Sequence, residues 1–159
     1  MPVFSARLKA LSSVLSAGEQ NALDRKIDPQ VFLAARLAPD MFALPRQVQI
    51  ATDHAKGAPS RLAGRDVPKY EDNEVSFADL QARIAKTLDH LATFSASDFD
   101  GSDNKVIELK LGQREMSMDG MQYLLHVAMP NFYFHVTTAY DILRHNGVPV
   151  TKAIFLGSR

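Results

Sequence analysis

The sequence predicts an all-α fold: a four-helix bundle with one short extra helix and a small β-hairpin, formed as a single domain by residues 1–159. Apolar residues recur every three or four positions in long stretches, a spacing that places them on one face of a helix. One short stretch instead alternates with the period of two typical of a strand. With 46% apolar and 23% charged residues, the composition is that of a soluble globular protein that can bury a core.

The first helix is predicted from Val3 to about Ala17, and Gly18 is expected to end it or loosen its last turn. Its apolar stripe is Phe4, Leu8, Leu11 and Leu15. A short helix follows, with Asp28 as its N-cap and Pro29 at its first position. Its apolar residues are Val31, Phe32, Leu33 and Leu37. Pro39-Asp40 is expected to close this helix.

The second long helix is predicted from about Leu44 to Leu62, and Pro59 is expected to bend or shorten its last turns. Its stripe is Leu44, Val48, Ala51, Ala55, Ala58 and Leu62. The third long helix begins at Ser76, which has Asp79 three residues later in the manner of a capping box. Its stripe is Phe77, Leu80, Ile84, Leu88 and Leu91. The polar residues 64–73 between the two helices predict a loop.

A β-hairpin is predicted between residues 106 and 118, with Gly112-Gln113 as its turn. A lone hairpin is marginally stable, so this one is expected to lean on the helices. The last helix is predicted from about Asp119 to His145, interrupted at Pro130 and capped by Asn146-Gly147. The following tail is expected to pack its apolar residues, 153–156, on the bundle or on a partner.

The composition disfavours several classes of function. The chain has no cysteine, which removes disulfides, thiolate nucleophiles and thiolate metal sites. Eighteen basic residues balance eighteen acidic ones, and a net charge of zero argues against a nucleic-acid binder. No membrane span, signal peptide, glycine-rich phosphate loop, nucleophile elbow or H-E-x-x-H motif is found. We therefore expect a cytoplasmic protein that binds neither nucleic acid nor membrane.

The last helix carries the strongest candidates for chemistry. Asn131 and His135 lie four residues apart, and with Thr138 they share a face with apolar residues, so they are expected to point inward. Buried polar groups need partners. The partner of these three is a metal or small molecule, or else another protein group in a hydrogen-bonded core cluster that fixes helix register. Both alternatives stay open.

Other histidines are weighed in the same way. His54, on the second long helix, is expected at the border of the core and is the second candidate ligand. Asp53 is expected on the solvent side, and the loop carboxylates Glu71-Asp72 are expected to be solvated. His90 and His126 are interpreted as surface or partner-facing residues, and His145 as a helix C-terminal cation.

Aromatic residues make the last helix apolar nearly all round. Its second face carries Tyr123, His126, Tyr133, Thr137, Tyr140 and Arg144. A helix of this kind is central or has a second packing surface. We therefore predict a homodimer, and we include Tyr140 with Thr138 among the candidate ligand-binding residues.

Several segments together resemble the DinB/YfiT-like four-helix-bundle superfamily, and more closely an uncharacterised branch of it known as a domain of unknown function. These segments are residues 37–42, 47–49, 53–58, 61–64 and 71–74, and Pro130 through Gly147. The resemblance covers nearly the whole chain. It implies the bundle fold and frequent dimerisation.

The resemblance also implies a site. Metal-binding relatives use one histidine of the second helix and an H-x-x-x-H pair of the last. Here these positions are matched by His54 and by Asn131 and His135. Asn131 departs from the pattern, because an amide is a poorer ligand for Zn or Ni than an imidazole. The sequence thus predicts a degenerate metal or small-molecule site, with Zn or Ni bound weakly or not at all. The alternative is a non-enzymatic structural or interaction protein whose polar trio only pins the core.

Overall fold

The computed structural model describes residues 2–111 and 114–157. Its four long helices are α1 (Pro2–Asp24), α3 (Leu44–Ala63), α4 (Phe77–Ala92) and α6 (Met129–His145). The short helical elements are α2 (Pro29–Ala34), the 3-10 turn η1 (Ala96–Phe99), α5 (Gly120–Gln122), the π-helical η2 (Tyr123–Ala128) and α7 (Lys152–Leu156). Strands β1 (Val106–Leu111) and β2 (Arg114–Asp119) complete the fold, which confirms the predicted bundle with its hairpin.

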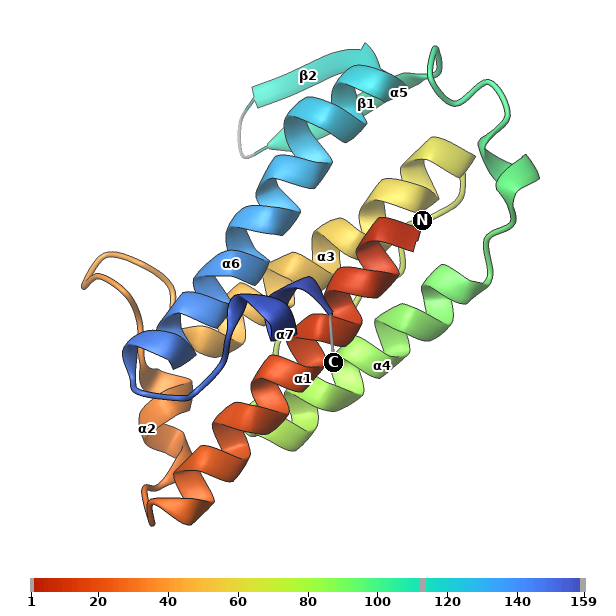
Figure 1. The fold of residues 1–159 in the computed structure, drawn as a ribbon. Helices are drawn as coiled ribbons and strands as arrows, with labels where there is room; N and C mark the ends of the chain where they lie inside the picture. The colour runs from red at the N-terminus through yellow and green to blue at the C-terminus, as the bar shows by residue number, and fades with distance from the viewer. Residues whose placement is uncertain (1, 112–113, 158–159) are drawn as a thin grey trace.

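The long helices do not pack in chain order. α3 packs against α4 and α6, and α1 packs against the same two helices from the opposite side of the bundle. The consecutive long helices α1 and α3 are therefore diagonal neighbours. The segment between α3 and α4 runs back along the bundle before α4 begins (Figure 1). Some connections thus cross the bundle.

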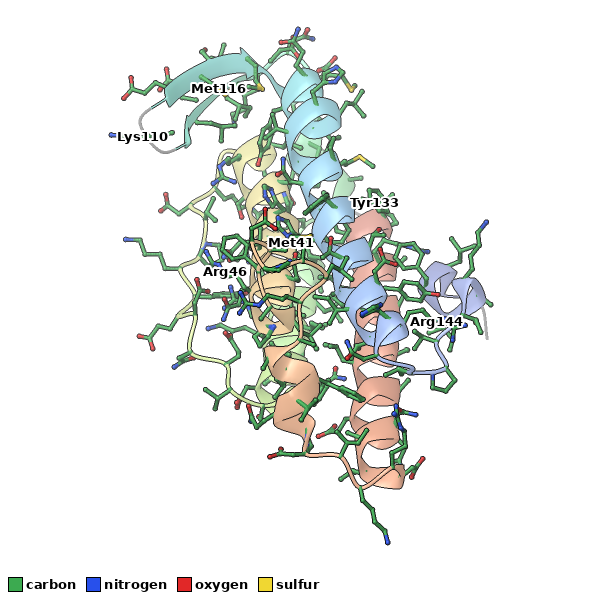
Figure 2. The ribbon with its side chains drawn as sticks, turned by 90° about the vertical axis from the view of Figure 1, so that its left-hand side faces the viewer. Met41, Arg46, Lys110, Met116, Tyr133 and Arg144 are labelled. Atoms are coloured by element: carbon green, nitrogen blue, oxygen red, sulfur yellow. The ribbon has the colours of Figure 1, made fainter. Side chains whose placement is uncertain are left out.

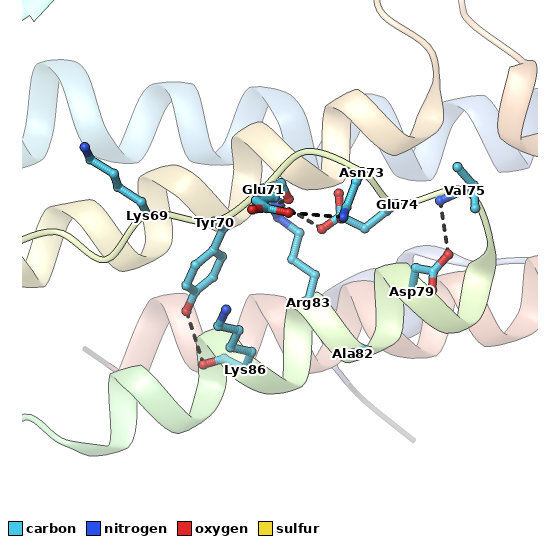
Figure 3. A pocket seen from close by; sticks show the side chains of 10 residues that line it. All are labelled: Lys69, Tyr70, Glu71, Asn73, Glu74, Val75, Asp79, Ala82, Arg83 and Lys86. Carbon is cyan, nitrogen blue, oxygen red and sulfur yellow. Dashed lines mark hydrogen bonds and ion pairs between the residues drawn. The ribbon is translucent and has the colours of Figure 1, made fainter.

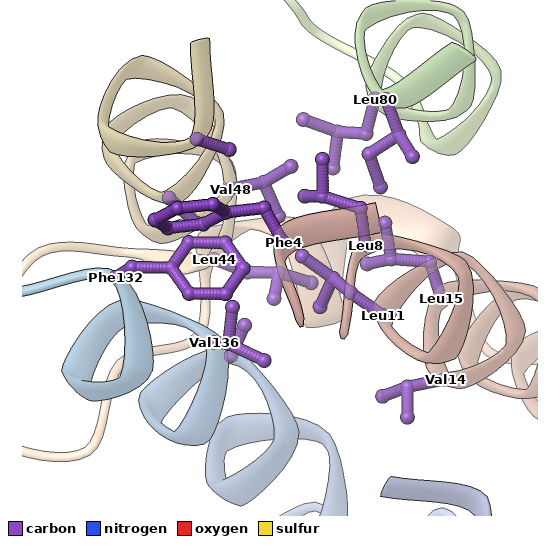
Figure 4. Packing of buried hydrophobic residues seen from close by; sticks show 14 of the residues in the cluster. Phe4, Leu8, Leu11, Val14, Leu15, Leu44, Val48, Leu80, Phe132 and Val136 are labelled. Atoms are coloured by element: carbon purple, nitrogen blue, oxygen red, sulfur yellow. The ribbon is translucent and has the colours of Figure 1, made fainter. Parts of the chain in front are cut away.

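The predicted apolar stripes form one core. Phe4 of α1 meets Phe132 of α6 edge to face, with ring centroids 4.9 Å apart. Figure 4 shows these rings beside Leu8, Leu11, Leu44 and Val48, and all of these side chains are buried. Each fully buried leucine or phenylalanine stabilises the fold by about 1.5–3 kcal/mol before cavity effects.

Two helix ends differ from the predictions. α1 continues past Gly18 to Asp24, because this glycine serves helix packing: a Cβ there would lie 3.0 Å from the side chain of Leu143 on α6. α2 ends at Ala34, before the predicted Leu37, because Ala35 is already extended.

Two proline and glycine positions shape α3. Pro59 does not shorten the helix, which runs to Ala63. Gly64 then ends it with a φ of 69°, a left-handed conformation that suits glycine.

The hairpin is antiparallel and leans on the bundle as expected. Its register pairs Val106 with Asp119 and Ile107 with Met118. Ile107 and Leu109 point into the core. The predicted turn, Gly112-Gln113, lies outside the described residues.

The last helix is continuous from Gly120 to His145, through α5, η2 and α6 (Figure 1). Pro130 lacks the N–H that an α-helix needs, and the turns before it wind as a π-helix. The predicted interruption is therefore a change of helical pitch. Asn146 caps the C-terminal end, as predicted.

The tail folds back on the bundle, which confirms its expected packing. Arg7 of α1 donates hydrogen bonds to the carbonyls of Phe155 and Leu156 of α7. The ring of Phe155 lies 5.5 Å from that of Tyr140, centroid to centroid. Within the described residues, no helix has the length and apolar character needed to cross a membrane.

Candidate functional site

Two of the predicted site residues meet between α3 and α6. The rings of His54 and His135 are nearly parallel, with an interplanar angle of 13° and centroids 6.4 Å apart. His135 is 9% exposed and His54 is half-buried. Figure 2 shows this face of the bundle, with Arg46 labelled on the α3 side and Tyr133 on α6. The sequence prediction that these helices bring the two histidines together agrees with this geometry.

Gln47 fixes the state of the His135 ring. Its side-chain nitrogen donates a hydrogen bond of 2.9 Å to the carbonyl of Phe42, so its oxygen must face the other way. That oxygen lies 2.7 Å from Nδ1 of His135. Because an amide oxygen can only accept, Nδ1 carries the proton and Nε2 keeps a free lone pair. His135 is thus held as a hydrogen-bond acceptor.

Burial keeps both imidazoles neutral. Desolvation by burial, together with the smaller effects of the nearby His54 and Arg46, lowers the pKa of His135 to about 4. The pKa of His54 is also lowered, first by burial and then by Arg61 and Lys56, with Asp53 opposing the shift. At neutral pH the pair therefore offers two uncharged nitrogen bases.

Arg61 on α3 lies near one member of this pair, His54. Arg61 Nη1 donates a hydrogen bond of 3.0 Å to the hydroxyl of Tyr123, and its guanidinium lies over the Tyr123 ring. The side chain folds back across Gly57, where a Cβ would stand 2.3 Å from Nη1. A glycine inside a helix costs about 0.5–1 kcal/mol relative to alanine. At Gly57 the helix bears that cost, and the absence of a Cβ leaves room for the Arg61 guanidinium.

Asn131 and Thr138 do not join the histidines in the predicted way. Asn131 is exposed, and its side-chain amide donates to the carbonyl of Val127 one turn earlier. Thr138 is buried and donates to the carbonyl of Phe134. The expectation that Asn131 points inward is wrong: the buried face of α6 is centred on Phe132, Val136 and Ala139, which leaves Asn131 at its edge.

Tyr140 lies on another side of α6. Its hydroxyl donates to the carbonyl of Val150, and its ring packs on Phe155 of α7. The second aromatic face of the last helix is thus covered in part by the tail of the same chain. Tyr123, which was placed on that face, is buried.

The donor set does not fit a tightly bound metal. Two imidazoles on one Zn in tetrahedral geometry have ring centroids about 5 Å apart, because each nitrogen lies about 2 Å from the metal. His54 and His135 exceed this spacing. No group of three or more His, Cys, Asp or Glu side chains suited to a metal occurs among the described residues.

Sequence reasoning missed a charged network around Arg83 on α4. This side chain is 2% exposed and forms ion pairs with Asp53, Asp72 and Glu74. Asp53 and Asp72 each keep 39% of their side-chain surface exposed, as expected, but the sequence did not predict that both pair with Arg83. One signal was available: Arg83 falls between Leu80 and Ile84 on the apolar stripe, and a buried arginine needs carboxylate partners.

The network closes one side of a hollow of about 600 Å³ between α4 and residues 69–75 (Figure 3). Tyr70 stands over it, with Lys86 Nζ 4.3 Å and Lys56 Nζ 4.5 Å from its ring centroid. Arg83 Nε also donates to Thr52. The charges of Arg83 and its carboxylate partners are paired with one another. We therefore interpret the network as one that holds residues 69–75 against α4.

His90 was interpreted as a surface or partner-facing residue, but its ring contacts a buried side chain. Its Nε2 lies 3.0 Å from the hydroxyl of Ser60, a buried residue of α3. Ser60 donates its own proton to the carbonyl of Lys56, so the hydroxyl accepts from His90. This pair ties α4 to α3 and lacks the proton arrangement of a serine nucleophile and its base. His126 and His145 are exposed, as predicted.

Comparison with known proteins agrees with the fold. The profile of a family described as a domain of unknown function (DUF1993) matches residues 1–156. A crystal structure of a DinB family member protein from Shewanella denitrificans is 42% identical, with a TM-score of 0.90. The similarity covers 98% of this chain and 88% of that one. A search of curated proteins returned no match.

Proposed function

The chain belongs to the DUF1993 family of DinB-like helical bundles, and we propose that it binds a small molecule between α3 and α6, at His54 and His135. The observation that carries this proposal is the chain of hydrogen bonds from the Phe42 carbonyl through Gln47 to His135. It orients one imidazole and leaves its Nε2 free to accept. Proteins commonly orient a binding side chain in this way, through a hydrogen bond from a supporting residue.

The spacing of the two rings supports a hydrogen-bonded ligand over a shared metal. An oxygen atom hydrogen-bonded to both imidazoles at about 2.8 Å allows ring centroids up to about 8 Å apart. The observed 6.4 Å lies within this range. Two neutral bases of lowered pKa suit a ligand that donates hydrogen bonds or gives up a proton.

Weak binding of Zn or Ni at the same pair stays part of the proposal, because neutral imidazoles are good ligands for both metals. The rings must first approach each other, so we expect low affinity. Titration of tag-free protein with Zn or Ni, followed calorimetrically, tests this. Binding that is unchanged in His135→Gln would place the metal elsewhere.

A thermal-shift screen of small molecules tests the main proposal, since a ligand that binds the native state must raise the Tm. We expect at least one compound to raise the Tm of the wild type and of His126→Ala, an exposed control, but not of His135→Ala. A screen in which every stabilising compound also stabilises His135→Ala contradicts the proposal.

A structural role is the second candidate function. It is favoured by one observation: among the described residues, no buried side-chain nitrogen or oxygen lacks a hydrogen-bond partner. On this alternative His135 and Gln47 pin α6 to α3 and bind nothing. It predicts that His135→Ala lowers the stability and that no compound raises the Tm of the wild type through this site.

A further inference from the structure

Arg61 carries a charge that its surroundings do not neutralise. It forms no ion pair with a carboxylate within residues 2–111 and 114–157, whereas Arg46, Arg65 and Arg83 do. Among the described residues, its hydrogen-bond partner is the neutral hydroxyl of Tyr123, which is buried. A guanidinium has five N–H donors in a planar fork, so most of them stay available.

The position of Arg61 near the end of α3 has a simpler explanation, which the geometry does not favour. A cation in the last turn of a helix interacts well with the C-terminal dipole. The Arg61 side chain, however, folds back toward the N-terminal end and lies against Gly57, one turn earlier. Contact with the dipole does not require this glycine, but the folded-back guanidinium does.

His54 connects Arg61 to the proposed binding site. His54, Gly57 and Arg61 follow one another at spacings of three and four residues, so they share a face of α3. Arg61 is close enough to lower the pKa of His54. His54 in turn faces His135 across the helix pair. A cation and two neutral imidazoles therefore lie in one row.

We propose that Arg61 is an oxyanion-binding residue, and that the small molecule held by His54 and His135 carries a carboxylate or phosphate group that Arg61 binds. This proposal rests on the function proposed above and adds the chemical class of its ligand. The fork of the guanidinium matches two oxygens of such a group, and the half-buried setting strengthens the charge-assisted hydrogen bonds. Gly57 serves this contact by leaving space for the fork.

The test follows arginine Nε–H signals by NMR while inorganic phosphate or acetate is added, with sodium chloride at matched ionic strength as the control. We expect the Arg61 signal, assigned by its loss in Arg61→Lys, to shift saturably at millimolar anion. Arg83 is the internal control, because Thr52, Asp53 and Glu74 already occupy its donors. An Arg61 signal that responds to neither anion, or equally to chloride, overturns the proposal.

Two substitutions separate this role from a structural one. Arg61→Gln removes the charge, and Gly57→Ala adds a Cβ that displaces the guanidinium while favouring the helix. Both are expected to weaken phosphate or acetate binding at least tenfold, and Gly57→Ala is expected to keep or raise the Tm without anion. Gly18→Ala, another glycine inside a long helix, is the matched control and should bind as the wild type does. Wild-type affinity in Arg61→Gln or Gly57→Ala refutes the proposal.

The two proposals can fail separately. Neutral compounds that stabilise the wild type and Arg61→Gln equally, and require His135, would support the histidine site and overturn the anion position. Anion binding that requires Arg61 but is unchanged in His54→Gln and His135→Gln would support the anion position and remove the small-molecule site at the histidines.

Discussion

At the scale of single residues, His135 shows how a buried polar group is made tolerable. An unpartnered buried donor costs about 1–3 kcal/mol. Gln47 removes that cost at Nδ1, and Phe42 in turn occupies the nitrogen of Gln47. These contacts leave the lone pair of His135 Nε2 free at the edge of the core, so the protein holds a base there without an unpaired buried donor.

The lowered pKa of His135 makes stability depend on pH. The unfolded chain binds a proton near pH 6.5, whereas the folded protein does so only near pH 4. Stability is therefore fully present above about pH 6.5 and is lost as the pH falls toward 4. The loss by pH 5 is about 2 kcal/mol. Urea unfolding at pH 7 and pH 5 measures it, with His135→Gln expected to lose less than the wild type.

The exposed His126 supplies the control for this measurement. His126→Gln should keep the wild-type difference between the two pH values, because its side chain is exposed to solvent in the folded protein. If His135→Gln loses as much stability as the wild type, the pH dependence arises at other groups.

The contrast between Asn131 and His135 marks what sequence reasoning could reach at this scale. Their spacing correctly placed them on neighbouring turns of one helix. The inward direction was taken from Leu124, Ala128 and Ile142, which share a face with both residues at 100° per residue. The buried side of α6 is centred on Phe132, Val136 and Ala139, so His135 lies within it and Asn131 lies at its edge. Periodicity alone places such a border residue poorly, so His135 was found and Asn131 was misplaced.

At the scale of elements, the segment between α3 and α4 is held by charge. Arg83 donates to the carbonyl of Glu71 and to Glu74, while Lys56 and Lys86 each place Nζ within 4.5 Å of the Tyr70 ring centroid. The segment has no helix or strand of its own before Phe77. Its order depends on side chains that reach it from the helices.

Arg83→Met is expected to lower the free energy of unfolding by about 3 kcal/mol, because it leaves carboxylates beside an apolar group. Hydrogen exchange should also speed up in residues 69–75. The matched control is Arg46→Met, whose side chain is 41% exposed and pairs with Asp72. It should cost about 1 kcal/mol or less. Equal losses in urea unfolding for both variants would contradict the central role of Arg83.

The N-terminus of α4 is a second element-scale test. The hydroxyl of Ser76 accepts from the backbone N–H of Asp79, and the Asp79 carboxylate accepts from the N–H of Val75. Ser76→Ala should therefore cost about 1 kcal/mol. Ser13→Ala, in the exposed face of α1, should cost nothing measurable in the same thermal unfolding experiment. A stable Ser76→Ala variant would show that other contacts fix this helix end.

The starts of α2 and α4 show which parts of the fold the local sequence encodes. Caps such as Asp28 and Ser76 act within a turn, and both were predicted correctly. Gly18 was misread as a helix end, because its function is to admit Leu143 from a helix far away in the sequence. Arg83 was missed for the same reason: its partners lie on other elements.

At the scale of the whole molecule, the diagonal placement of α1 and α3 brings α3 against α6 and so creates the histidine pair. The stripes predicted the number of helices, but not which helices would be neighbours. The resemblance to a family supplied that arrangement. Without it, His54 and His135 would have remained two separate candidates.

The predicted homodimer belongs to this scale. Part of the aromatic surface of α6 that suggested it packs on the tail, through Tyr140 and Phe155. Phe134 remains 56% exposed on the same helix, as does Phe42 in the segment whose backbone Gln47 binds. Aromatic residues are enriched at protein interfaces, so we expect the dimer contact to include Phe134.

Sedimentation over a range of concentrations tests this contact. The wild type should be a dimer at micromolar concentration, and Phe134→Ser should raise the dissociation constant at least tenfold, because a buried phenylalanine contributes about 2 kcal/mol or more to an interface. Val75→Ser is the control: Val75 is 70% exposed, in the segment just before α4. A monomeric wild type at high micromolar concentration would refute the dimer. A dimer whose dissociation constant is unchanged in Phe134→Ser would place its contact elsewhere.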